Sequence, residues 1–204
     1  MNTVTKLLAT MAIATATVMP MTAANAVTIE ILNDHCNHND PNCTVVYLQG
    51  DIRPGDEKTF AAVVKNIKDD VLVVLNSGGG EFEAGMNIAR QIKNRGFTTS
   101  ASNFCASVCA VIWLSGSLRF YLRESSIGMH GVYRTRVDRN GNRINGAPVY
   151  GSSSGNAVLG AYLAELGLAP KTIATLTEAG PGDMYWLKTK NLKDLGIEAK
   201  RIDG

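Results

Sequence analysis

The stretch Val71-Leu72-Val73-Val74-Leu75-Asn76-Ser77-Gly78-Gly79-Gly80 joins five consecutive apolar residues to a turn that contains three glycines. An apolar run of this length is typical of a parallel strand that is covered on both faces of its sheet. The glycines allow a tight turn directly after the strand and leave its backbone N–H groups unscreened by side chains. The stretch therefore indicates an α/β fold with a glycine turn at the carboxyl end of a central strand.

Predicted strands and helices alternate on either side of this stretch. β-Branched and apolar runs predict strands at 44–50, 97–100 and 119–122. Apolar residues at helical spacing predict a helix that Asp56 can cap, a helix over 84–92 that ends at Gly96, and a helix over 108–114. Further helices are expected at 158–166, at 171–178 after Pro170, and around 188–195. This alternation with short connections predicts a mostly parallel sheet flanked by helices.

Residues 131–155 interrupt the alternation. Asn140-Gly141 is a strong hairpin-turn signal between the flanking segments 133–137 and 143–144. Residues 151–155, with the sequence Gly-Ser-Ser-Ser-Gly, are expected to be flexible. We interpret 131–155 as a hairpin or flap insertion, and three roles stay open: covering a substrate groove, self-association, or a mobile surface loop.

A hydroxyl and an imidazole follow the glycine turn along the chain. Ser107 opens the predicted helix at 108–114, and His130 comes 23 residues later. Acyl transfer needs such a nucleophile, a base that takes its proton, and N–H groups that face the developing oxyanion. The other two histidines, His35 and His38, lie together near the N-terminus. The base of a Ser–His reaction is therefore expected to be His130.

The first 26 residues have the pattern of a cleavable export signal. Lys6 supplies a short positive segment, 7–19 form an apolar and small-residue core that Pro20 ends, and Ala24-Asn25-Ala26 offers a cleavage site. The alternative, an uncleaved anchor, needs about 20 apolar residues, which this run does not supply. We therefore expect a periplasmic or secreted protein with no membrane span in the mature chain.

Cleavage would leave 178 residues, which suits one domain. We expect a short N-terminal segment over 27–43 and the main domain over 44–204. The full chain has a formal net charge of +2, which gives no electrostatic sign of nucleic-acid binding.

Export gives the four cysteines a meaning, because disulfides persist in oxidising compartments. Cys36 and Cys43 flank a polar loop, and we expect a disulfide between them. The alternative is a metal site, but its spacing matches no zinc pattern, so we expect no metal. The residues that would form this site are Asp34, His35, Cys36, His38, Asp40 and Cys43. Cys105 and Cys109 straddle Ser107, and their state stays open among buried thiols, a bridge across a distorted turn, and pairing with the other cysteines.

Three motifs resemble those of a known family. Residues 45–196 resemble the Clp-protease and crotonase superfamily, and most closely the proteolytic subunit of the Clp protease. The segment 76–80 is similar to that family's Asn-Ser-Pro-Gly-Gly loop, and Ala84-Gly85-Met86 to the Ala-Gly-Met that follows it. Ala106-Ser107-Val108 resembles the Ala-Ser-Met around the family's nucleophile, and Gly128-Met129-His130 the Met-Ile-His around its base. The three motifs in this order and at this spacing are specific together.

The resemblance implies a fold of stacked ββα units and a set of site residues. Ser107 would be the nucleophile and His130 the general base. The N–H groups of Gly79 and Val108 would form the oxyanion hole. An extended peptide substrate would lie between the backbones of two segments. These segments contain Gly80, Glu81 and Phe82 on one side and Gly131, Val132 and Tyr133 on the other.

The family's third catalytic residue is an aspartate, which the resemblance does not place uniquely. Counting back from Gly196 leads to Gly180, with Glu178 and Asp183 as the nearest carboxylates. We favour Asp183, because Pro181-Gly182 can turn it inward, and Glu178 is the alternative. Gly78 stands where the family has proline.

These observations predict an exported Ser–His hydrolase that acts on peptide or protein substrates, forms a homo-oligomer and needs no cofactor. No ATPase partner is expected, because the space outside the cytoplasm holds no nucleotide pool. One alternative is a non-catalytic binding or assembly module on the same fold. Another is a crotonase-type acyl-thioester enzyme, which the presence of both Ser107 and His130 disfavours.

Overall fold

The computed structural model describes residues 27–32, 43–68, 70–136, 138–139, 144 and 149–202. The predicted export signal, Cys36 and the residues 140–142 of the predicted hairpin turn lie outside these residues. All of the residues proposed for the alternative metal site except Cys43 also lie outside them.

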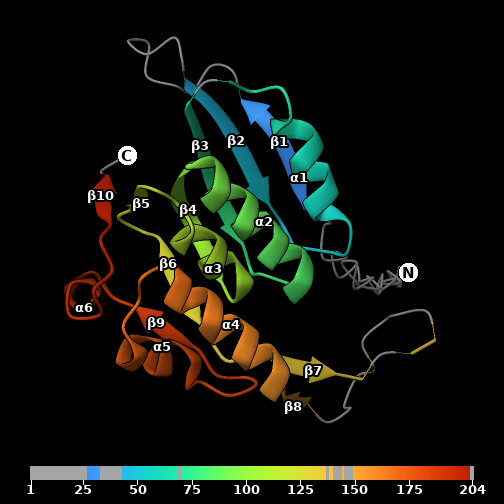
Figure 1. The fold of residues 1–204 in the computed structure, drawn as a ribbon, viewed down its shortest axis with the longest axis vertical. Helices are drawn as coiled ribbons and strands as arrows, with labels where there is room; N and C mark the ends of the chain where they lie inside the picture. The colour runs from blue at the N-terminus through green and yellow to red at the C-terminus, as the bar shows by residue number, and fades with distance from the viewer. Residues whose placement is uncertain are drawn as a thin grey trace, which may run out of the picture.

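A mostly parallel sheet forms the centre of the molecule (Figure 1). Its main path runs β1-β2-β3-β4-β5-β10. The bounds are β1 Thr28–Leu32, β2 Cys43–Gln49, β3 Asp70–Ser77, β4 Thr98–Ala106, β5 Arg119–Leu122 and β10 Lys200–Ile202. Neighbours along this path are parallel except for β1, which runs antiparallel to β2. The predicted α/β class with a mostly parallel sheet is confirmed.

Three helices follow the parallel strands: α1 Asp56–Val64, α2 Phe82–Arg95 and α3 Val108–Leu114. Figure 1 shows α1 and α2 in front of the sheet, and side chains of α2 join those of β3 in the core. Val73 and Leu75 are fully buried, whereas Leu72 and Val74, on the opposite face of β3, are only half-buried. The prediction of a strand covered on both faces therefore holds fully for one face only.

β4 pairs with two different strands along its length. Its first half, at 99–101, pairs with β5, and its last residues, at 104–106, pair with β6 Ser126–Met129. β6 in turn pairs antiparallel with β9 Tyr185–Leu187. Because β4 and β6 are parallel neighbours, the residues that follow them, Ser107 and His130, emerge at the same edge of the sheet.

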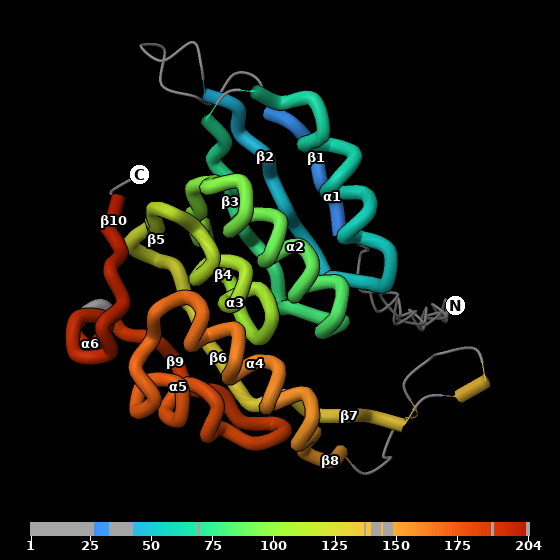
Figure 2. The backbone as a smooth tube through the Cα atoms, viewed as in Figure 1, coloured from blue at the N-terminus to red at the C-terminus, as the bar shows by residue number. Residues whose placement is uncertain are grey.

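The C-terminal part adds a layer of helices and a projecting arm. α4 Ser153–Glu165 and α5 Pro170–Thr177 pack against each other, and α5 contacts β9. The arm consists of β7 Tyr133–Thr135 and β8 Val149–Gly151, which pair antiparallel. Figure 2 shows the arm extending from the body with its root beside α4. A short helix, α6 Thr189–Leu192, precedes β10.

Several predicted elements need correction. The strand expected at 97–100 continues to Ala106, and Asp56 is the first residue of α1 rather than its cap. The segment 151–155 is not a flexible loop, because Ser152 caps α4 by accepting from Gly155 N–H at 3.1 Å. The last helix covers four residues instead of the expected eight.

The hairpin differs as well. β7 pairs with β8 at Val149–Gly151, and the predicted partner segment contributes a hydrogen bond from Ile144 N–H to Arg136 O at 3.0 Å. The short strands β1, β6, β9 and β10 were not predicted. Among the described residues, no helix has both the length and the apolar character to cross a membrane.

Candidate functional site

Ser107 lies at a sharp turn between β4 and α3. β4 ends at Ala106 and α3 begins at Val108, so Ser107 alone makes the change of direction. Its φ of 58° and ψ of −129° make it the one non-glycine residue with a positive φ in the described part of the chain. Its N–H donates to Gly128 O of β6 at 2.9 Å, and the side chain is half-buried. Such a strand-to-helix turn presents a serine hydroxyl at the rim of the sheet.

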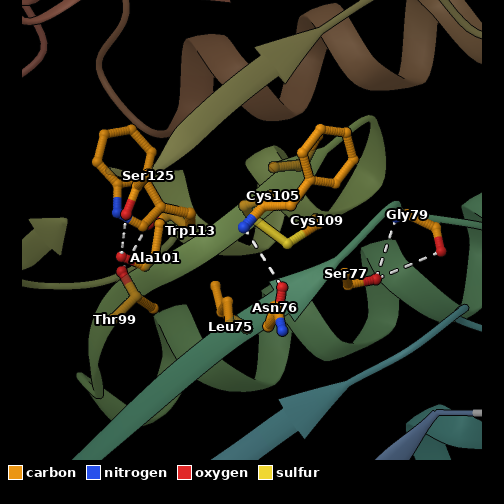
Figure 3. The surroundings of a disulfide bond; sticks show 12 residues. Leu75, Asn76, Ser77, Gly79, Thr99, Ala101, Cys105, Cys109, Trp113 and Ser125 are labelled. Carbon is orange, nitrogen blue, oxygen red and sulfur yellow. Dashed lines mark hydrogen bonds between the residues drawn. A yellow bond between two sulfur atoms is a disulfide. The ribbon is translucent and has the colours of Figure 1, made fainter. Parts of the chain in front are cut away.

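Cys105 and Cys109 form a disulfide across this turn, with their Cα atoms 5.2 Å apart. Of the three states left open by the sequence, the structure therefore has the bridge. It is possible because Cys105 lies in β4 and Cys109 in α3, so the two residues do not share one helix. Both cysteines are fully buried. In Figure 3 the bridge lies next to the end of β3, close to Asn76 and Ser77.

The glycine turn packs directly against Ser107. Gly79 has a φ of 93°, and a Cβ at this position would lie 2.7 Å from both Ala106 O and Ser107 Cβ. Only glycine fits so close to the serine. Gly79 N–H donates to the buried Ser77 Oγ at 3.0 Å (Figure 3). By contrast, the N–H groups of Gly80 and Val108 have no hydrogen-bond partner among the described residues.

His130 follows β6 directly, and its ring is held on two sides. Nδ1 lies 2.7 Å from Gly131 O. Because a carbonyl oxygen only accepts, Nδ1 carries the proton, and Nε2 of the neutral ring is left as an acceptor. The Tyr133 ring packs against the imidazole with 5.0 Å between the ring centroids. This tautomer is the one that a general base acting through Nε2 requires.

Ser107 and His130 line one pocket of about 840 Å³. One wall contains the glycine turn and the start of α2, and the other contains the root of the arm and the start of α4. The apolar part of the lining comes from Phe82, Val108, Val111, Val132, Val158, Leu159 and Met184. No hydrogen bond joins Ser107 to His130 in the described residues. The two groups are thus brought to one cavity without a hydrogen bond between them.

The carboxylates predicted for the third position lie outside this pocket. Asp183 is exposed, and its Oδ1 accepts from Met184 N–H at 2.8 Å. Asp183 and His130 do line a second, smaller pocket of about 400 Å³. Glu178 is exposed at the end of α5 and lines neither pocket. Among the described residues, no hydrogen bond joins Asp183 to His130 to support the orienting role expected from the resemblance.

The two segments predicted to bind substrate differ in how many free backbone groups they offer. Val132 N–H donates to Asn156 Oδ1 at 2.7 Å, and Val132 O accepts from Ser152 N–H at 2.7 Å. Gly131 N–H donates to Ala179 O at 2.9 Å. Peptide binding through these groups would require the arm root to rearrange.

On the opposite wall, the expected strand-like backbone ends at Gly80. Gly80 forms a parallel bridge with Ile52, but Glu81 caps α2, with its carboxylate accepting from Ala84 N–H at 2.6 Å. Phe82 is therefore helical instead of extended.

Three features of this site were not found from the sequence. The sequence indicates Ser77 only as part of the glycine loop, yet its buried hydroxyl accepts a hydrogen bond from Gly79 N–H. The carbonyl of Gly131 has no signal in a sequence, because every residue carries one. Tyr133 is expected in the arm and in the peptide-binding backbone but not against His130, although its place three residues after His130 is a usable sign of ring contact. Among the described residues, no group of three His, Cys, Asp or Glu side chains could hold a metal ion.

Comparison with known proteins gives similarity at the level of structure. No protein-family model matches the chain, and no curated protein matches its sequence. The solved structure of ClpP1 from Listeria monocytogenes matches with a TM-score of 0.59 at 20% identity, over 78% of this chain and 91% of that chain. The ClpP protease catalytic domain from Plasmodium falciparum matches with a TM-score of 0.56 at 18% identity, over 80% and 86%.

A third solved structure is the 1510-N membrane-bound stomatin-specific protease. It matches with a TM-score of 0.58 at 15% identity, over 76% of this chain and 77% of that chain. All three are similar to this chain along most of its length. The chain therefore has the ClpP-like fold, as the three motifs predicted.

Proposed function

We propose that this chain is an exported serine peptidase of the Clp-protease type, with Ser107 as nucleophile and His130 as general base. One observation carries the proposal: Ser107, at a positive φ, and His130, whose Nδ1 lies 2.7 Å from Gly131 O, line one pocket beside the glycine turn. The ClpP-like fold supports it, because the solved structures that share this fold include proteases.

In the proposed reaction, Ser107 Oγ attacks a peptide carbonyl while His130 Nε2 accepts the hydroxyl proton. His130 then returns this proton to the leaving amine, and water hydrolyses the acyl-enzyme by the same route. A side-chain rotation would have to bring the hydroxyl and Nε2 within hydrogen-bond distance, since catalytic hydrogen bonds are often long before substrate binds.

The developing oxyanion would be stabilised by Val108 N–H and by an N–H of the glycine turn. Gly79, the residue implied by the resemblance, lies against Ser107, but its N–H is bonded to Ser77 Oγ in the resting structure. It becomes a donor only if that bond breaks. Gly80 N–H has no partner among the described residues and is the second candidate donor.

The substrate proposed is an extended peptide with an apolar side chain in the pocket. The apolar wall formed by Val111, Val132 and Leu159 gives such a side chain a place next to the reacting serine. Export would separate the chain from nucleotide-driven unfolding, so short or already extended polypeptides fit better than folded ones. We propose that the chain assembles with further copies of itself, as its resemblance to the Clp protease implies.

A non-catalytic binding module is the second candidate. It is favoured by the bonded Gly79 N–H and by the absence of a Ser107–His130 hydrogen bond within the described residues. The two candidates differ in one property, which is the nucleophilicity of Ser107.

A fluorophosphonate probe measures this property directly. We expect the mature wild-type protein to be labelled, and labelling to fall by at least about 10²-fold in Ser107→Ala and in His130→Ala. Ser154→Ala is the matched control, because Ser154 is another serine of the same pocket. Labelling of that variant should persist.

Absence of label on folded wild-type protein would favour the binding module. Label that persists in Ser107→Ala would mean that another serine reacts. A peptide mapped by mass spectrometry after labelling should carry the probe at Ser107, and any other position contradicts the proposal.

A further inference from the structure

The disulfide that spans Ser107 is the feature of the site that the proposed reaction does not use. Cys105 and Cys109 lie two residues before and two residues after the serine, and neither sulfur-bearing side chain is exposed. The following inference rests on the proposed function of Ser107 as nucleophile.

The bridge closes a loop too short to act mainly on the unfolded chain. In the loop-entropy description, a cross-link stabilises a protein by restricting the unfolded ensemble, and the effect grows with the number of residues enclosed. The two cysteines lie only four positions apart in the sequence, so the bridge restricts the unfolded chain very little. The main consequence of this bridge is therefore expected in the local structure of the turn.

The local structure that the bridge encloses is an unfavourable one. Ser107 has a side chain but a φ of 58°, a region that non-glycine residues occupy only when their surroundings hold them there. Two backbone hydrogen bonds help, from Ser107 N–H to Gly128 O and from Ala110 N–H to Ser107 O. The disulfide adds a covalent connection between the end of β4 and the first turn of α3.

The same bridge also reaches the glycine turn. Cys105 is the register partner of Ser77 across β3 and β4, and Ser77 Oγ holds Gly79 N–H. Gly79 in turn contacts the Ser107 side chain so closely that no Cβ would fit. The bridged turn thus carries Ser107 and also adjoins the glycine turn through Ser77; Figure 3 shows Ser77 and Gly79 near the disulfide.

We propose that the Cys105–Cys109 disulfide is a positioning device that holds Ser107 in its reactive backbone conformation, so that the site matures only when these two thiols are oxidised. Formation of the S–S bond removes two electrons and two protons from the thiols. A disulfide-bonded oxidant takes them up by thiol–disulfide exchange and leaves as a dithiol. In a reducing compartment the chain would fold with a relaxed turn, and Ser107 would react slowly.

The first test compares labelling rates of oxidised and bridge-free protein with the fluorophosphonate probe. We expect Cys105→Ala/Cys109→Ala to fold, as judged by far-UV circular dichroism and cooperative melting, and to be labelled at least about 10-fold more slowly than wild type. If the folded variant is labelled as fast as the wild-type protein, the proposal is overturned.

A matched control removes the other two cysteines. Cys36→Ser/Cys43→Ser keeps the bridge at Ser107, so any effect of a dithiol reductant on this variant must come from Cys105 and Cys109. We expect its labelling rate to match wild type before reduction and to fall after reduction, with recovery on reoxidation. This variant tests the proposal even if the double-alanine variant does not fold. If reduction leaves its labelling rate unchanged, the proposal is overturned.

A second readout does not depend on activity. Hydrogen–deuterium exchange should quicken at the Ser107 and Ala110 amides after reduction, because both hydrogen bonds depend on the turn. The amides of α2 should not change. Unchanged exchange at 105–110 would overturn the proposal, whereas quickened exchange in a protein that never labels would retain the positioning role and reject the peptidase.

Discussion

At the scale of single residues, the orientation of His130 is set by its own neighbours in the chain. Nδ1 donates to Gly131 O at 2.7 Å, and Gly131 itself is fixed because its N–H donates to Ala179 O. A carbonyl can select the tautomer of a histidine as a carboxylate does, although it does not carry the negative charge that stabilises an imidazolium. In the proposed peptidase, Gly131 O would therefore orient the imidazole of His130 without a carboxylate.

The role of Asp183 can be measured against this arrangement. We expect Asp183→Asn to change the fluorophosphonate labelling rate by less than about 3-fold, because the Nδ1 proton is directed at Gly131 O and Asp183 Oδ1 bonds to Met184 N–H. An orienting catalytic carboxylate would instead cost on the order of 10³-fold or more when replaced by an amide. A loss of that size would make Asp183 the third member of a triad. Glu178→Gln is the matched control for a nearby exposed carboxylate.

The sequence was informative about side chains at this scale and silent about the backbone. Ser107 and His130 were predicted because they follow the glycine turn along the chain and because the other two histidines lie near the N-terminus, and both line one pocket. The positive φ of Ser107 and the acceptor carbonyl of Gly131 depend on tertiary hydrogen bonds, which no local pattern encodes. The disulfide could not be assigned, because its feasibility depended on whether β4 extends to Ala106.

At the scale of elements, the start of α4 shows how tertiary packing overrides composition. The segment Gly-Ser-Ser-Ser-Gly predicted a flexible loop, yet Ser152 caps the helix and Gly155 belongs to its first turn. The strands β6 and β9 were missed for a related reason. Each has only a few residues and is defined by its partner instead of by an alternating pattern of its own.

The two glycines of α4 give opposite expectations for the same substitution. A Cβ on Gly155 would lie 2.5 Å from Val132 Cγ1 and 2.9 Å from Val132 Cβ, and valine has little rotamer freedom with which to move away. We expect Gly155→Ala to destabilise the protein by about 1–3 kcal/mol through this overlap, measured by urea denaturation. Since Val132 lines the pocket, labelling should slow as well.

Gly160→Ala is the control within the same helix. Its Cβ would meet only Ile173 Cγ2, at an ordinary 3.7 Å. Alanine is the better helix former, so stability should rise by up to about 1 kcal/mol. Equal effects of the two substitutions would show that the close approach of Gly155 to Val132 does not exist in solution.

At the scale of the whole molecule, a buried polar contact joins the sheet-covering helices to the C-terminal helices. Ser115, just after α3, and Tyr162 of α4 are both almost fully buried, and their hydroxyl oxygens lie 2.8 Å apart. Ser115 Oγ donates its proton to Val111 O, so the Tyr162 hydroxyl must be the donor in the contact. Burial raises the pKa of Tyr162 above its ordinary value.

This pKa shift predicts how the stability of the fold depends on pH. A tyrosine whose pKa is raised in the folded state contributes stability that is complete below about pH 10, its unfolded pKa, and is lost as the pH rises toward the folded value. At pH 7 we expect Tyr162→Phe to lower the free energy of unfolding by about 1 kcal/mol, the contribution of one hydrogen bond, because Ser115 keeps Val111 O as a partner. Above pH 10 the difference in the free energy of unfolding between the variant and the wild-type protein should shrink and then reverse, since phenylalanine has no proton to lose.

Denaturation curves at pH 7 and pH 10.5 test this, with Tyr150→Phe, at a 60% exposed position, as the control. A difference that stays constant with pH would mean that Tyr162 is not held as a buried donor between α3 and α4.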